Sequence, residues 1–99
     1  MRRPAPLCDC CGRALAGLAD ARVVLVFDDL DRLVGAALDH AACVAGPPGP
    51  GDRIETLPAR DLILDARTAQ RLAALARLHT AASVKRLVRR CERLATVAA

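Results

Sequence analysis

The sequence predicts a small α+β protein, in which an N-terminal β-hairpin finger stapled by zinc precedes a short strand and two helices. Three observations predict this class. Pairs of cysteine and histidine with metal-ligand spacing flank a valine-rich stretch, a Gly- and Pro-rich segment follows, and leucines then recur at helical intervals. Residues 1–45 are expected to form the finger, 46–60 a linker, and 61–99 a strand-helix-helix module.

The finger is expected to contain a β-hairpin. Residues 22–27 are rich in valine and short enough for a strand, and residues 32–38 return as its partner. Three aspartates between the strands favour a turn, because their carboxylates bond nearby backbone amides. A calcium loop is the alternative, but the Gly and the final Glu of an EF-hand are missing. The three are Asp28, Asp29 and Asp31.

The second half is expected to be mainly helical. Residues 46–51 contain three prolines and three glycines, which mark a boundary. Residues 61–65 are a short apolar run between acids and predict a strand, and residues 67–79 predict a helix with His79 on its packed face. Ser83 is the expected N-cap of the last helix. The apolar stripe of that helix is Val84, Leu87, Val88, Cys91 and Leu94, which makes Cys91 a small core residue.

Four side chains have the spacing of a structural metal site. Cys8 and Cys11 are three residues apart and precede Gly12, which permits the positive φ of a chelating turn. His40 and Cys43 repeat the three-residue offset. Three thiolates and one imidazole complete a tetrahedron around one Zn²⁺ ion and leave no open position for catalysis.

Other interpretations of these cysteines stay open. They could be scattered through an alanine-rich chain without a shared role, although the two matched pairs argue against this. Cys10 is expected to be a spare thiol or a fallback ligand, because adjacent cysteines do not easily face one ion. A redox CxxC would follow a strand and open a helix, and no such context surrounds Cys8 and Cys11.

Length and composition agree with a metal-reinforced domain. The chain has 99 residues, five cysteines and a single aromatic residue, Phe27, so its core needs support. The basic start lacks a following apolar segment, and no apolar run is long enough for a bilayer. We therefore expect a cytoplasmic protein with no membrane contact, where cysteines favour metal over disulfides. No Ser/His/Asp set or phosphate-binding Gly loop indicates an enzyme.

The order CxxC…HxxC over residues 8–43 resembles the treble-clef and LIM-type zinc fingers. The resemblance covers about a third of the chain. It implies a finger that docks proteins, binds nucleic acid or staples a fold.

Residues 61–95 resemble ribbon-helix-helix regulators. The similarity lies in Leu62-x-Leu64-Asp65, Leu72-x-x-Leu75-Ala76 and Ser83-x-x-x-Leu87-Val88-Arg89-x-Cys91. It implies a homodimer whose paired strands enter the DNA major groove. It also implies that Ser83 and Val84 hold a phosphate at a helix N-terminus.

Charge gives this half a second link to nucleic acid. Residues 51–99 carry ten Lys and Arg against five Asp and Glu. Phosphate contacts are expected from Lys85, Arg86, Arg89, Arg90 and Arg93. Two hypotheses follow: a dimeric DNA-binding transcriptional regulator, or a zinc-stapled adaptor whose basic helices dock onto a protein partner. A helical hairpin whose arginines are only a solvated face is the remaining alternative.

Overall fold

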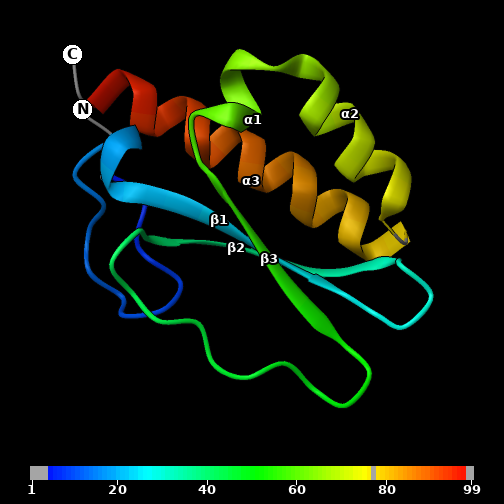
Figure 1. Ribbon diagram of the computed structural model, residues 1–99. Helices are drawn as coiled ribbons and strands as arrows, with labels where there is room; N and C mark the ends of the chain where they lie inside the picture. The colour runs from blue at the N-terminus through cyan, green and yellow to red at the C-terminus, as the bar shows by residue number, and fades with distance from the viewer. Residues whose placement is uncertain (1–4, 77, 98–99) are drawn as a thin grey trace.

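The computed structural model describes residues 5–76 and 78–97, with the backbone alone at 78–81 and 97. It confirms a small α+β fold in which helices pack on an antiparallel sheet (Figure 1). The elements in chain order are η1 (Leu18–Asp20), β1 (Ala21–Phe27), β2 (Leu33–His40), β3 (Arg53–Pro58), α1 (Asp61–Leu64), α2 (Ala66–Leu75) and α3 (Leu78–Val97).

The predicted hairpin is confirmed as β1 and β2. The register pairs Ala21 with His40 and Phe27 with Leu33, with an irregularity at Val26/Phe27. Asp28 organises the turn, because its carboxylate accepts the backbone N–H groups of Leu30 and Arg32 at 2.9 Å each.

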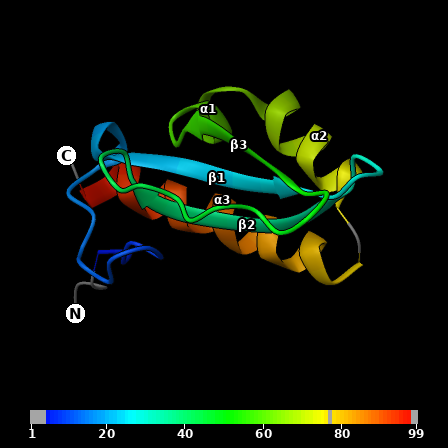
Figure 2. The ribbon, with the colours of Figure 1, turned by 60° about the horizontal axis from the view of Figure 1, so that its bottom comes forward.

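Residues 53–58 form a strand that the sequence analysis placed in a linker. This strand, β3, pairs antiparallel with the other side of β1, which gives the sheet order β2-β1-β3. Because β2 and β3 flank β1, the connection between them crosses the sheet. Figures 1 and 2 show this connection on the side of the sheet away from α1 and α2.

The strand predicted at residues 61–65 is wrong. Residues 61–64 form the short helix α1, in which Leu64 N–H donates to Arg60 O at 2.9 Å. In a strand, Leu62 and Leu64 would lie on the same face of the sheet. Leu62 is instead buried while Leu64 is 79% exposed. The ribbon that the ribbon-helix-helix resemblance implied is therefore not formed by these residues.

The two predicted helices exist, but their boundary is displaced. The helix expected over 67–79 is α2, which begins at Ala66 and ends at Leu75; Asp65 caps it by accepting the N–H of Arg67 at 3.0 Å. The break expected between the helix end at residue 79 and the N-cap at Ser83 lies inside α3, which begins at Leu78. Ser83 is consequently an interior helix residue and not an N-cap. The side chain of His79 lies outside the described residues.

One hydrophobic core joins both halves of the chain. Its buried members from the sheet are Ala21, Val23, Leu25, Phe27, Leu33 and Leu38, and those from the helices are Leu62, Leu72, Val84, Leu87, Cys91 and Leu94. The expected core position of Cys91 is thus confirmed. Within the described part of the chain, no helix has both the length and the apolar character needed to cross a bilayer.

Candidate metal centre

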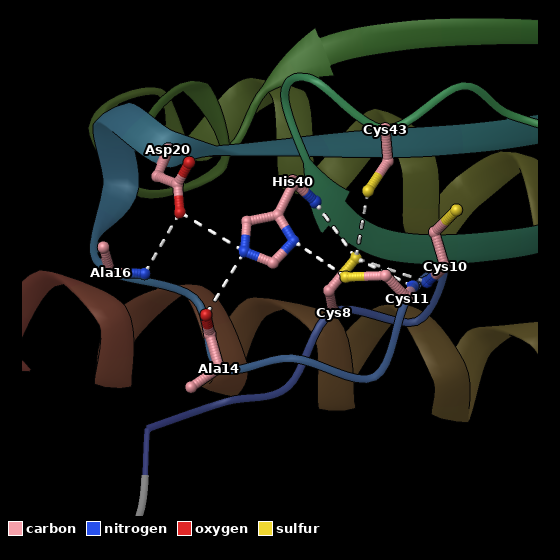
Figure 3. Close-up of polar contacts among 8 residues, drawn as sticks. All are labelled: Cys8, Cys10, Cys11, Ala14, Ala16, Asp20, His40 and Cys43. Carbon is pink, nitrogen blue, oxygen red and sulfur yellow. Dashed lines mark hydrogen bonds and ion pairs between the residues drawn. The ribbon is translucent and has the colours of Figure 1, made fainter.

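The loop that precedes the sheet folds back on itself around Cys8. Cys8 N–H donates to Arg13 O at 2.8 Å, and Gly12 N–H donates to Cys8 O at 2.9 Å. Gly12 has a φ of 78°, which a residue with a Cβ adopts only with strain. This reversal places the Cys8 and Cys11 side chains at the same end of the sheet (Figure 3).

His40 and Cys43 come from the end of β2. His40 is the last residue of the strand, and Cys43 N–H donates to His40 O at 3.0 Å in the turn that follows. Cys43 Sγ lies 3.8 Å from Cys8 Sγ, and His40 Nδ1 lies 3.2 Å from Cys11 Sγ. The two predicted ligand pairs, far apart in the sequence, therefore converge.

The four side chains could hold one metal ion. Their ligand atoms all lie within 4.8 Å of one another. A tetrahedron with zinc–sulfur bonds of about 2.3 Å has sulfur–sulfur edges of about 3.8 Å. The distance between the Cys8 and Cys43 sulfurs equals that edge.

Backbone amides prepare Cys8 for a cation. The Cys8 thiol is buried, yet its Sγ accepts N–H groups from Cys10 at 3.3 Å, Cys11 at 3.4 Å and His40 at 3.2 Å. Burial alone would raise the pKa of Cys8, but these hydrogen bonds lower it to about 6. Cys8 is therefore more readily ionised to a thiolate than an ordinary cysteine.

Cys43 behaves in the opposite way. Burial and the hydrogen bond with Cys8 raise the pKa of Cys43 to about 12. Sulfurs this close cannot all be anionic unless a cation lies between them. A divalent ion would supply the missing charge, because a coordinating thiol is deprotonated by its metal.

Asp9 fastens the metal loop to β2 and to α3. Its backbone N–H donates to Leu38 O at 2.9 Å, and its carboxylate accepts Leu38 N–H at 2.8 Å. Arg90 of α3 donates to Asp9 Oδ2 at 2.9 Å and to Leu7 O at 2.6 Å. Burial raises the pKa of Asp9, but the hydrogen bonds from Arg90 and from the Leu38 N–H, together with the charge of Arg90, lower it below its usual value. Arg90, predicted as a phosphate ligand, is thus engaged in the fold.

The other predicted nucleic-acid residues divide into two groups. Val84 is 2% exposed and faces the core, and Ser83 lies within the helix, so neither can hold a phosphate at a helix N-terminus. Lys85, Arg86 and Arg89 are exposed, and Arg93 is half-buried. Arg86, Arg89 and Arg93 line a surface hollow together with Glu92 and Thr96.

Cys10 lies outside the group of four. Its side chain points away from the other three sulfurs (Figure 3). Its thiol is exposed, and its Sγ is 3.9 Å from the backbone oxygen of Val44. Its backbone N–H nevertheless supports Cys8. This placement agrees with the expectation of a spare thiol beside the site.

No protein-family model, curated protein or solved structure matches this chain. Functional inference therefore depends on the chemistry of the site itself.

Proposed function

We propose that this chain binds one Zn²⁺ ion through Cys8, Cys11, His40 and Cys43, and that the ion is structural. The observation that carries the proposal is the convergence of the four ligand atoms within 4.8 Å. Three thiolates with one imidazole form a donor set typical of zinc, and four protein ligands leave no position for a substrate. The ion would tie the N-terminal loop to the end of β2.

Zinc stoichiometry tests this proposal directly. Elemental analysis of the purified full-length chain should give one zinc per molecule, and Cys8→Ser should lose it. Cys10→Ser is the matched control, because it removes a neighbouring thiol that lies outside the group of four and should keep one zinc. A wild-type chain that binds no zinc when supplied with it would overturn the proposal.

The exposed side of α3 supports a second function, binding to the phosphate backbone of DNA. Arg86, Arg89 and Arg93 follow one another along the helix with the spacing i, i+3, i+7, and line one hollow. In the described residues, neither Arg86 nor Arg89 forms an ion pair within 4.0 Å. Lys85 adds a further exposed charge beside them. Contacts of this kind supply affinity without reading the base sequence.

A regulatory role would follow from this surface, with the zinc centre holding the domain in shape. The dimeric strand pairing of ribbon-helix-helix regulators is not part of the proposal, because residues 61–64 are helical. The adaptor hypothesis differs only in the partner, since an acidic protein surface would meet the same arginines.

Binding of random duplex DNA at two salt concentrations tests the second function. Affinity should fall as salt rises, and Arg89→Ala should lower the slope of log affinity against log salt by about 1. Arg67→Ala is the matched control, because Arg67 is exposed on α2 and should leave the slope unchanged. No binding at low salt would remove the DNA function and favour the adaptor.

A further inference from the structure

Asp20 lies on the far side of His40 from the sulfurs. Figure 3 shows the imidazole between the Cys11 thiol and the Asp20 carboxylate. His40 Nδ1 is 3.2 Å from Cys11 Sγ, whereas His40 Nε2 is 3.4 Å from Asp20 Oδ2 and 3.2 Å from Ala14 O. The two ring nitrogens therefore face different chemistry.

These contacts determine which nitrogen can bind a metal. The Ala14 carbonyl and the Asp20 carboxylate are both acceptors, so the nitrogen between them has to carry the hydrogen. A neutral imidazole protonated at Nε2 has its lone pair at Nδ1. That lone pair is on the side of the three cysteines.

Asp20 is itself held in place. Its Oδ2 accepts the N–H of Ala16 at 3.2 Å, and its backbone oxygen accepts the N–H of Ala41 at 2.8 Å. Ala41 directly follows His40. Asp20 therefore contacts both the backbone next to His40 and the His40 ring. Among the described side chains, no Lys or Arg lies within 4.0 Å of the Asp20 carboxylate. The imidazole of His40 is therefore, among the residues that the structure describes, the basic group next to this carboxylate.

We infer that Asp20 is a positioning residue for the metal centre, which orients His40 so that Nδ1 is the ligand atom. This inference rests on the proposed zinc site. The hydrogen bond of Nε2 is formed with Ala14 O, and the Asp20 carboxylate lies beside the same nitrogen at ion-pair distance. A carboxylate next to the second ring nitrogen of a ligating histidine fixes the ring and raises its basicity. Loss of such a partner typically weakens metal binding about 10- to 100-fold.

Zinc affinity, measured by competition with a chromophoric chelator, tests the role of Asp20. Asp20→Ala should bind zinc about ten-fold more weakly than wild type. Asp20→Asn keeps an oxygen at this position without the negative charge and should weaken zinc binding less than Asp20→Ala does. Asp29→Ala is the matched control, because Asp29 is exposed in the hairpin turn, far along β1 from the site, and its loss should change nothing.

Long-range ¹H–¹⁵N NMR of the zinc-loaded chain separates positioning from general destabilisation. In wild type, His40 should carry its hydrogen on Nε2 and coordinate through Nδ1. In Asp20→Ala, the Nε2 hydrogen should exchange with water faster, whereas Asp20→Asn should slow it again. Unchanged exchange in Asp20→Ala, or coordination through Nε2, would overturn the inference.

The two proposals fail in different ways. If wild type and Asp29→Ala both fail to bind zinc, the metal site is wrong and the role of Asp20 falls with it. If both bind zinc tightly and Asp20→Ala matches them within two-fold, the metal site stands and only the role of Asp20 is overturned.

Discussion

Two regions of this small domain, the metal centre and the helical layer, are stabilised by different interactions. Around the metal centre, polar contacts converge on a few atoms, with Cys8 Sγ alone accepting three backbone N–H groups. The helical layer instead packs aliphatic side chains against the sheet. Its buried residues are Leu62, Leu72, Val84, Leu87 and Leu94.

This contrast shows how a chain with one aromatic residue forms a folded domain. Aliphatic burial contributes in small increments, so the loss of one side chain in the helical layer has a graded effect. The metal centre depends on four ligands acting together, so the loss of one should remove most of its contribution. The experiments below compare these two modes, from the largest expected effect to the smallest.

Loss of a metal ligand should have the largest effect. Apparent binding free energies of structural zinc are on the order of 10 kcal/mol or more. We expect Cys43→Ser, or chelation of the wild type, to expose residues 5–20 to proteases well before the helical layer. Limited proteolysis with mass spectrometry of the fragments measures this. Equal resistance in Cys43→Ser and wild type would show that the ion contributes little to the fold.

A core truncation in the helical layer should be the next largest. Leu94 is fully buried, so Leu94→Ala should reduce the free energy of unfolding by about 2–5 kcal/mol. Because Leu94 is not a ligand, the folded variant should still bind one zinc. Chemical denaturation and elemental analysis measure the two quantities. If folded Leu94→Ala failed to bind zinc, the metal centre would depend on packing in the helical layer.

Arg90 connects the helical layer to the loop of the metal centre, and its removal should have an intermediate effect. Its side chain is 18% exposed, and its guanidinium donates to both carboxylate oxygens of Asp9 and to Leu7 O. Arg90→Ala should lower the free energy of unfolding by about 1–2 kcal/mol, as for hydrogen bonds to a charged group. Arg89→Ala is the control, since Arg89 is exposed and should cost less than about 0.5 kcal/mol.

DNA binding should reverse the order of these two variants. Arg89→Ala should weaken binding, whereas folded Arg90→Ala should bind nearly as wild type does. If Arg90→Ala weakened DNA binding and Arg89→Ala did not, Arg90 would be a phosphate contact, as the sequence predicts.

Spacing predicted the group of four candidate metal ligands because their chemistry is local to each pair. Two three-residue offsets identify Cys8, Cys11, His40 and Cys43 without any knowledge of the fold. Asp20 and Arg90 carry no such local signal. Asp20 approaches His40 from 20 positions away, and the Arg90–Asp9 pair spans 81 positions. A run of arginines in the sequence does not show which member meets a carboxylate.

The fold was predictable where residue types agreed with tertiary contacts. Valines in residues 22–27 correctly predicted β1. The apolar run at 61–64 was too short for periodicity to distinguish a strand from a helical turn. Residues 53–58 escaped detection because β3 is an edge strand with several exposed residues, next to a segment rich in Pro and Gly. Ser83 has the chemistry of a cap but lies within α3, which begins at Leu78.

The smallest expected effect is a pH dependence at the hairpin turn, which lies at the opposite end of β1 from the metal centre. The backbone N–H of Arg32 and, after it, the Arg32 side chain and the N–H of Leu30 stabilise ionised Asp28 and lower its pKa. A group whose pKa is lowered by folding stabilises the fold above its unfolded pKa, about 3.9, and loses that contribution as pH falls through the lower folded value.

Asp28→Asn removes the charge at every pH. The difference in unfolding free energy between wild type and this variant should therefore be constant near neutral pH and shrink below about pH 4. Denaturation at pH 7 and pH 3 measures it, with Asp29→Asn as the control. A difference that grows on acidification would show that the turn is not stabilised by the Asp28 carboxylate.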